Sequence, residues 1–290
     1  MNKIASSELV LNPDGSVYHL NLLPEHIAND IIFVGDQNRV PKVAKHFDNQ
    51  EFDIQKREFR TITGTYKGKR ITVISTGIGP DNIDIVMNEL DALVNIDLKN
   101  RTIKENHTTL NIVRIGTSGS LQNDIPVDGF VLGTHGIGFD GVLHSYDCEH
   151  ILEKDIEDAF IKHTHWNPRK ARPYVVKNSP ELQAKLISDK VYTGMTGTAV
   201  GFFGPQGRVL RLALEDADLN KKIDSFNFNG IRVSNLEMET SAIYGLSKLL
   251  GHNACSMNAI IANRANKTFS QDPYKPVEEL IIYTLNKLAE

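Results

Sequence analysis

Apolar positions along the chain fall into short runs separated by polar turns and amphipathic stretches. The runs are too short for long helices and contain many β-branched residues, a pattern typical of buried strands. We therefore expect strands at 31–34, 71–75, 112–115, 130–133, 191–195, 231–234 and about 254–262.

Amphipathic stretches lie between these runs. One covers about 38–47, and another begins at 81, where apolar residues recur at steps of three and four. Asp81 or Asn82 is a suitable N-cap for this second helix. Further helices are expected at 242–250, ending at Gly251, and at 277–289. Alternating strands and helices predict an α/β fold, a three-layer α/β/α sandwich around a central mixed sheet.

Residues 140–190 depart from this alternation. The segment is polar, contains His144, His150, His163 and His165, and ends near Pro180 at the start of a short helix. It is interpreted as an insertion or elaborated loop of a single domain covering 1–290. The histidines lack a recognised metal-ligand spacing, so no metal is expected there.

Composition excludes several classes of function. The chain has 290 residues, a formal net charge of -4 and 40% hydrophobic residues, which is ordinary for a globular protein and lacks the basic excess of a nucleic-acid binder. Two cysteines do not make a disulfide framework. No signal peptide or membrane-spanning run is evident, so we expect no membrane partner and a cytoplasmic location.

Two strand ends carry arginines suited to an anion. Arg114 and Thr117 follow the predicted strand 112–115, and Gly35 and Arg39 follow 31–34 at a helix start. Ligands in open α/β sheets gather beyond the carboxyl ends of strands, and a guanidinium offers a planar fork of donors to phosphate. A structural ion pair of Arg114, or a simple N-cap at Asp36, are the alternatives.

The turn Thr76-Gly77-Ile78-Gly79 invites comparison with a dinucleotide-binding loop. It lacks the third glycine and the later acidic residue of that fingerprint. We expect its glycines to let the turn pass close to another backbone.

Two later stretches carry groups that could hold a base and a sugar. Residues 201–208 combine aromatic side chains with Gln206 and Arg208, which can recognise the edge and the face of a heterocycle, although a surface loop is an equal alternative. Glu237-Met238-Glu239 stands where a strand gives way to a helix. A carboxylate there can accept hydrogen bonds from two neighbouring hydroxyls, as in a sugar.

In this order, these motifs resemble the nucleoside phosphorylase family of the hexameric bacterial type, and most closely its uridine phosphorylase branch. The resemblance runs from about His19 to Arg264 and implies a phosphorylase/hydrolase-like fold over 1–290. It implies phosphorolysis of a pyrimidine nucleoside, with uridine and phosphate giving uracil and ribose 1-phosphate. The enzyme would be a pentosyltransferase of nucleoside salvage.

The resemblance also assigns the phosphate contacts. Gly35 and Arg39 match the first phosphate loop, Arg114 and Thr117 match the central contacts, and Arg57 matches an arginine supplied by the neighbouring subunit.

The base contacts follow in the same way. Phe202, Gln206 and Arg208 match the uracil-recognising stretch, with Gln206 facing N3 and O2 and Arg208 facing O4. Ile261 and Arg264 match the pocket wall and an arginine beside the base.

At the ribose, Glu237, Met238 and Glu239 match the sugar clamp, in which Glu239 binds the 2′- and 3′-hydroxyls and Met238 packs under the ring. His19 matches a histidine donated across a dimer to the 5′-hydroxyl. With His19 and Arg57 crossing between subunits, the resemblance implies a homo-oligomer with shared active sites, a dimer at least and a hexamer as the larger form.

The residues expected to act in catalysis are Arg114, Gln206, Arg208 and Glu239. No metal or organic cofactor is expected, since phosphate is a co-substrate. Some relatives hold a structural monovalent cation with the residue matching Glu58 and the following glycine turn, but Pro80-Asp81 replaces the Gly-Pro of bacterial uridine phosphorylases there.

The sequence leaves other interpretations of the preferred base and of catalytic activity open. Purine-specific relatives carry a Ser-Asp pair after the last strand, and this chain has Ala262-Asn263, which favours a pyrimidine. A purine nucleoside phosphorylase, a nucleosidase with a remodelled pocket, or a non-catalytic nucleoside sensor are the other interpretations.

Overall fold

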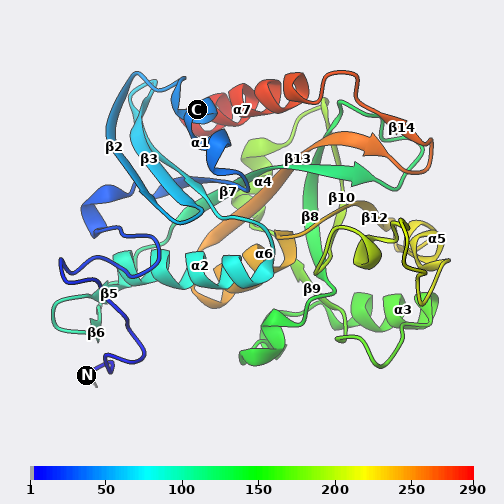
Figure 1. Cartoon of the computed structure of the whole chain (residues 1–290), viewed down its shortest axis with the longest axis horizontal. Coiled ribbons are helices and arrows are strands. Elements are labelled where there is room, and N and C mark those ends of the chain that lie inside the picture. Colours follow the sequence, from blue (N-terminus) through cyan, green and yellow to red (C-terminus); the bar gives the residue numbers. More distant parts are fainter. Residues whose placement is uncertain (1–2) are drawn as a thin grey trace.

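A mixed β-sheet runs through the centre of the molecule with helices on both faces. The computed structural model describes residues 3–290, and Figure 1 shows α1 and α7 on one side of the sheet and α2 and α6 on the other. This arrangement confirms the predicted three-layer α/β/α sandwich with a mixed sheet.

All seven predicted apolar runs lie in strands of the main sheet. These strands are β1 (Asp30–Val34), β2 (Asn49–Lys56), β3 (Phe59–Tyr66), β4 (Lys69–Ser75), β7 (Asn111–Ser120), β8 (Phe130–Gly138), β9 (Tyr174–Lys177), β10 (Val191–Thr198), β11 (Asn227–Phe228), β12 (Ile231–Glu237), β13 (Asn253–Asn263) and β14 (Thr268–Phe269). A separate small hairpin is formed by β5 (Ile96–Asp97) and β6 (Thr102–Ile103).

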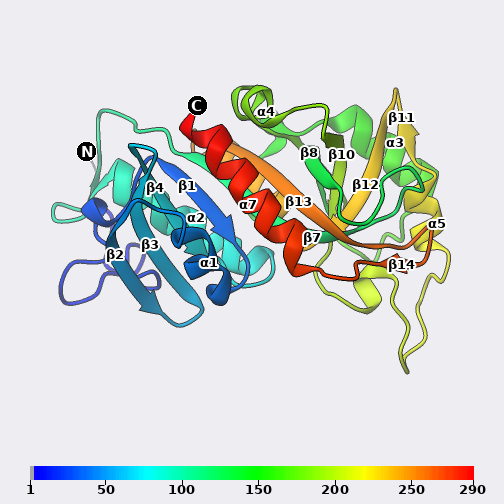
Figure 2. The same cartoon turned by 90° about the horizontal axis from the view of Figure 1, so that it is seen from above.

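The helices form the two outer layers. They are α1 (Val40–Ala44), α2 (Pro80–Asn95), α3 (Lys154–Thr164), α4 (Pro180–Leu186), α5 (Leu219–Asp224), α6 (Thr240–Leu249) and α7 (Tyr274–Ala289). The apolar faces of α2 and α6 pack into one buried cluster with β1 and the N-terminal segment. Those of α1, α4 and α7 pack into another on the opposite face. Figure 2 shows α7 crossing over β13 and β7.

The sheet closes on itself at one end. Its strand order is β11-β12-β10-β8-β13-β7-β1-β4-β3-β2, and β12 additionally pairs with β7. That antiparallel pairing joins Asn235 to Ser120 and Leu236 to Gly119. Strands β7, β13, β8, β10 and β12 therefore form a ring, which brings the ends of β7 and β12 together.

The structure corrects three boundaries. Arg114 was expected at the end of a strand, but β7 continues to Ser120, because the small residues after Arg114 remain paired with β13. The N-cap of α2 is Gly79, followed by Pro80 at the first helical position, and neither Asp81 nor Asn82 takes that place. The helix expected over 38–47 is shorter, a 3₁₀ turn followed by α1.

The description of 140–190 as an elaborated loop is wrong. The segment contains α3 and β9, and β9 pairs antiparallel with β8. Phe160 and Tyr174 are fully buried, and Phe160 packs in a cluster with residues of β10 and β12. The polar character of the segment gave no sign of the helix and the strand, which extend the main fold. As expected, a short helix, α4, begins at Pro180.

Among the described residues, no helix combines the length and the apolar character needed to cross a membrane.

Candidate active site

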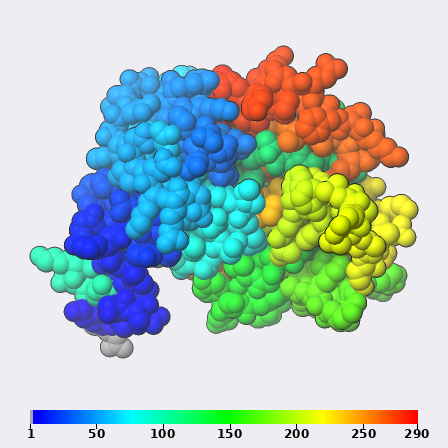
Figure 3. Space-filling view, viewed as in Figure 1, coloured from blue at the N-terminus to red at the C-terminus, as the bar shows by residue number. Residues whose placement is uncertain are grey.

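A cavity of about 680 Å³ opens where the strand ends of the closed ring meet the turns after β1 and β4. Figure 3 shows the segment of about 200–220, in yellow, on the face of the molecule turned to the viewer. Eleven of the fourteen predicted site residues line this cavity: Gly35, Arg39, Arg114, Thr117, Phe202, Gln206, Arg208, Glu237, Met238, Glu239 and Ile261. Segments more than 200 residues apart in the sequence therefore form one site.

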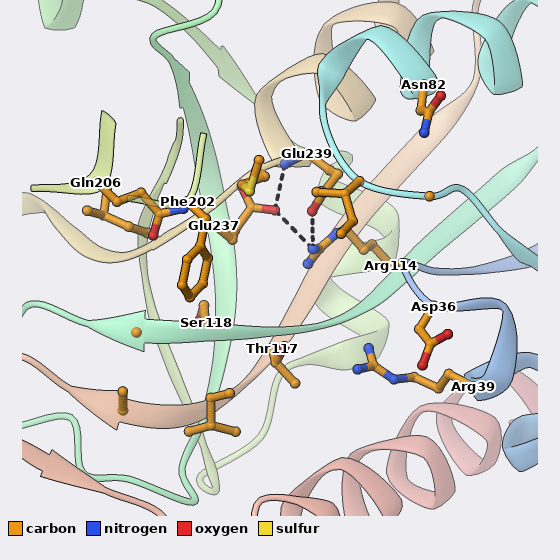
Figure 4. A pocket seen from close by; sticks show the side chains of 18 of the residues that line it. Asp36, Arg39, Asn82, Arg114, Thr117, Ser118, Phe202, Gln206, Glu237 and Glu239 are labelled. Atoms are coloured by element: carbon orange, nitrogen blue, oxygen red, sulfur yellow. Dashed lines mark hydrogen bonds and ion pairs between the residues drawn. The ribbon is translucent and has the colours of Figure 1, made fainter. Parts of the chain in front are cut away.

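Arg114 forms the centre of a buried ion-pair cluster. Its Nη2 donates to Glu239 Oε2 and lies 3.3 Å from Glu237 Oε2, as Figure 4 shows. Its Nη1 donates to Asn258 Oδ1 over 2.9 Å. The side chains of Arg114 and Glu239 are 7% and 6% exposed, so the pair is shielded from water. Removing one member of such a buried pair leaves an uncompensated charge.

The two glutamates have different surroundings. Glu237 Oε1 accepts from the Thr198 hydroxyl over 2.8 Å, and its carboxylate accepts the backbone N–H groups of Glu239 and Thr240 over 3.0 Å at the start of α6. A carboxylate offers about four acceptor positions, and these bonds together with Arg114 occupy them in Glu237. Glu237 thus fixes the start of α6.

Glu239 retains acceptor capacity. Its Oε1 accepts from the Gly79 backbone N–H over 2.9 Å and its Oε2 accepts from Arg114, which uses about two of its four acceptor positions. Gly79 has φ of 100° and Gly77 has φ of 72°, a conformation open to glycine. The glycine turn after β4 therefore brings a backbone donor to a side-chain carboxylate, whereas the sequence predicted a close approach to another backbone.

Burial shifts the pKa values in this cluster. For Glu239, burial raises the pKa above its ordinary range, Arg114 opposes this, and Glu237 adds to it. For Arg114, burial acts to lower the pKa, but the charges of Glu237 and Glu239 together raise it. At neutral pH Arg114 is therefore firmly charged, and Glu239 holds a proton to a higher pH than an exposed glutamate.

Arg39 provides a second guanidinium at this end of the cavity. Its Nη1 donates to the Ile115 carbonyl over 3.2 Å, and Asp36 lies beside it in Figure 4. Burial and then the charge of Arg114 lower the pKa of Arg39. Two arginines that repel one another, with Thr117 also on the wall, make a site that an anion would stabilise.

The opposite end of the cavity is formed by a loop. Arg208 lies over the Phe202 ring at 3.8 Å from its centroid, and Arg208 Nη1 donates to Gln206 Oε1 over 2.8 Å. Arg264 Nη2 donates to the same oxygen over 2.8 Å. Burial, and then the charge of Arg208, lower the pKa of Arg264 to about 10. Since Gln206 Oε1 faces both guanidinium groups, its amide N–H groups are turned away from them.

Three predicted residues do not line the cavity. Arg264 contacts the cavity residue Gln206 from behind. His19 Nδ1 instead lies 2.6 Å from Glu89 Oε1. Arg57 is exposed in the turn between β2 and β3, with φ of 55°, and has no hydrogen bond or ion pair to any residue within 3–290.

Other lining residues were not predicted as ligand contacts. They come from the turns and strand ends around the predicted motifs: Asp36, Gln37, Glu58, Gly77, Ile78, Asn82, Ser118, Gly119, Leu236, Ala262 and Phe269. Ser118, Leu236 and Ala262 directly adjoin predicted residues in the sequence, and Gly119 pairs with Leu236 where β7 meets β12. Phe269 lies on β14, a two-residue strand without a sequence signal.

Two places offer possible metal ligands. Asp91, His107 and His252 have donor atoms within 4.8 Å of one another, none of them in the cavity. However, His252 Nδ1 accepts a hydrogen bond from the Leu110 backbone N–H over 3.2 Å. In neutral His252 the proton is therefore on Nε2, and a protonated nitrogen cannot bind a metal ion. At the cavity edge, Glu58 and Asn82 both approach the space beside Gly77, where Glu58 could offer a carboxylate to a monovalent cation, whereas the nearest atom of Asn82 is its amide nitrogen.

The arrangement has three chemically distinct parts. Arg39, Arg114 and Thr117 can hold an anion, and Glu239 can accept hydrogen bonds from hydroxyl groups. The loop of Phe202, Gln206 and Arg208 can hold a flat polar ring by its face and edge.

Comparisons with known proteins agree with this geometry. The family model described as Phosphorylase superfamily matches residues 30–286. A uridine phosphorylase of Thermococcus kodakarensis is 25% identical over all of this chain and 93% of its own length. A purine nucleoside phosphorylase DeoD-type 2 of Shewanella oneidensis is 24% identical over 92% of this chain and 96% of its own.

A solved structure supports the same assignment. A nucleoside phosphorylase of Trypanosoma brucei, described as showing uridine phosphorylase activity, superposes with a TM-score of 0.85 at 28% identity, over 96% of this chain and 99% of that one. These matches confirm the resemblance to nucleoside phosphorylases seen in the sequence. The chain belongs to the phosphorylase superfamily.

Proposed function

We propose that this chain is a pentosyltransferase that catalyses the reversible phosphorolysis of uridine, giving uracil and ribose 1-phosphate. The observation that carries the proposal is the order of groups along one cavity. An arginine pair lies at one end, a carboxylate with free acceptor positions lies in the middle, and an aromatic, an amide and a guanidinium lie at the other end.

The proposed reaction is a substitution at C1′ of the ribose. A phosphate oxygen forms a bond to C1′ while the C1′–N1 bond breaks and its electron pair leaves with the base. Positive charge develops at C1′ and the ring oxygen, and the phosphate dianion stabilises it. Arg39, Arg114 and Thr117 hold that dianion in place, so their contribution is positioning and electrostatic stabilisation.

The departing uracil carries negative charge on its carbonyl oxygens. Arg208 and the amide N–H groups of Gln206 stabilise this charge by hydrogen bonds, which are strong where one partner is ionised. Phe202 covers the ring face. Glu239 accepts hydrogen bonds from the 2′- and 3′-hydroxyls at the acceptor positions that Gly79 and Arg114 leave open. Met238 packs under the sugar.

The choice of a pyrimidine rests on the end of β13. A purine leaves readily when an acid protonates its N7, and this chain has Asn263 where such an acid would stand. Asn263 Nδ2 donates to the carbonyls of Gln122 and Ile125 over 2.9 and 2.8 Å, so its amide is used to support the loop after β7. Uracil, which leaves as an anion, needs no such acid.

The proposed enzyme works as a homo-oligomer. His19 and Arg57 lie outside the cavity of their own chain, which supports their donation to the cavity of a second copy. The minimal unit is then a dimer, with a hexamer as the larger assembly. The reaction uses phosphate as co-substrate and requires no metal or organic cofactor.

The test is uracil release from uridine with and without phosphate, read by absorbance. The proposal expects release only with phosphate. Equal release in both would indicate a hydrolase. Faster release of base from inosine or adenosine would indicate a purine enzyme, and ligand-induced stabilisation without turnover would indicate a sensor.

A further inference from the structure

Asn258 lies directly behind Arg114 and outside the cavity. It is fully buried on β13, and its Oδ1 accepts from Arg114 Nη1 over 2.9 Å. Arginine only donates, so the amide oxygen must face it. Asn258 therefore contacts the guanidinium without contacting the space where a ligand would bind.

Gly116 provides the room for this contact. In the parallel pairing of β7 and β13, Asn258 stands opposite Gly116, and Arg114 stands opposite Ser256. A Cβ at Gly116 would overlap Arg114 Nη1 and would lie 2.6 Å from Asn258 Oδ1. The absent side chain lets the guanidinium fold back along its own strand, where Asn258 can reach it.

The other end of the amide is anchored to α6. Asn258 Nδ2 donates to Ser256 Oγ over 3.2 Å, and the same oxygen accepts from the Thr240 hydroxyl over 2.9 Å. Thr240 is the first residue of α6, and its backbone N–H donates to Glu237. One hydrogen-bonded chain thus connects Arg114 to the first residue of α6, which directly follows the segment that carries its carboxylate partners.

The neutrality of Asn258 matters for charge. Arg114 already faces Glu237 and Glu239, and with Arg39 the formal charge of these four side chains is zero. A third carboxylate on Arg114 would make the cluster negative and would repel an anion in a site shielded from water. An amide oxygen holds the guanidinium by a hydrogen bond, and it leaves the balance of charge unchanged.

We propose that Asn258 is a positioning residue for anion binding, which holds the Arg114 guanidinium in place while leaving its charge available to phosphate. This rests on the proposed function in naming phosphate as the anion.

The experiment is a calorimetric titration of the intact protein with inorganic phosphate and, separately, with uridine. Asn258→Asp places a carboxylate on Arg114 without a change in size, and Asn258→Ala removes the contact. We expect the Kd for phosphate to rise roughly tenfold or more in Asn258→Asp and by a smaller factor in Asn258→Ala, tenfold being about 1.4 kcal/mol. The Kd for uridine should change much less.

Asn178→Asp is the matched control. Asn178 is also buried, but its amide donates to the Gly133 carbonyl, and it does not line the cavity. Its substitution introduces a buried carboxylate elsewhere and should leave the Kd for phosphate unchanged.

Unchanged phosphate binding in both Asn258 variants would overturn the proposal, as would equal weakening of phosphate and uridine, which marks a general structural role. Wild-type protein that binds no phosphate would also overturn it. Uracil release is measured in a separate assay. If the proposed reaction fails there, a selective loss of phosphate binding in Asn258→Asp would still support the role of Asn258.

Discussion

The two ends of the cavity are built in different ways. The anion end is made of regular elements, where Arg114, inside β7, and Glu239, at the start of α6, are nearly buried and each has several partners. The base end is made of a loop, where Phe202 is 53% exposed and Gln206 and Arg208 contact mainly one another and Arg264. The charged groups of the proposed reaction thus lie in a fixed frame, and the groups that would choose the base lie on the more adaptable part.

The largest effect is expected at the anion end. Arg114→Ala should lower kcat/KM roughly 10²- to 10³-fold, as the loss of a preorganised charge-stabilising donor does. It should also lower the free energy of unfolding by about 3–5 kcal/mol, because Glu237 and Glu239 remain buried without their partner. Steady-state kinetics and chemical denaturation measure the two. A near wild-type rate would remove Arg114 from the site.

Glu239→Gln should change the pH dependence as well as the rate. Burial raises the pKa of Glu239. As the pH falls, its carboxylate is therefore protonated at a higher pH than that of an ordinary glutamate. The acid limb of kcat/KM in the wild type should then have a midpoint above about 4.5, and the variant, with reduced activity, should lack this limb. The same phosphate buffer series serves both proteins, so phosphate ionisation cancels. An identical acid limb in the variant contradicts the assignment.

Gly116→Ala tests whether the fixed position of the Arg114 guanidinium matters for activity. The added methyl group would overlap the Arg114 guanidinium, so we expect kcat/KM to fall roughly tenfold or more. Gly204→Ala is the matched control on the base loop, where the nearest atom to a new Cβ is Leu214 Cδ2 at 3.8 Å. That variant should keep its activity. Equal losses in both variants would erase the proposed difference between the two ends.

The smallest effect is expected at the base end. Phe202→Ala removes an exposed aromatic ring, a contact worth about 0.5–1.5 kcal/mol, so the KM for uridine should rise only a few-fold to about tenfold. The value of kcat and the midpoint of thermal unfolding should hardly change. A large fall in kcat would show that the loop takes part in the chemical step.

The sequence predicted well what depends on local pattern. The apolar runs located the central strands, and the glutamate pair was correctly placed between β12 and α6. It failed where small or polar residues form regular structure. The strand expected at 112–115 continues to Ser120 through small residues, and the polar hairpin of β2 and β3 had no apolar run to mark it.

The site residues were likewise predictable only where the local sequence carries a motif. Motif residues such as Arg39, Gln206 and Glu239 carry recognisable chemistry in sequence, and they meet in the cavity. Asn258 has no motif, because its role depends on standing opposite Gly116 across two strands 142 residues apart in the chain. The places of His19 and Arg57 outside their own cavity also depend on the fold, and their proposed role depends on a second chain.

The central claim is that phosphate held by Arg39 and Arg114 attacks the sugar. Its most direct test is ³¹P NMR of the protein incubated with uridine and inorganic phosphate, with uracil measured in the same sample. The account predicts that a ribose 1-phosphate resonance grows in equal amount to uracil and is nearly absent with Arg114→Ala. Uracil formed together with free ribose, and with the phosphate resonance unchanged, would contradict it.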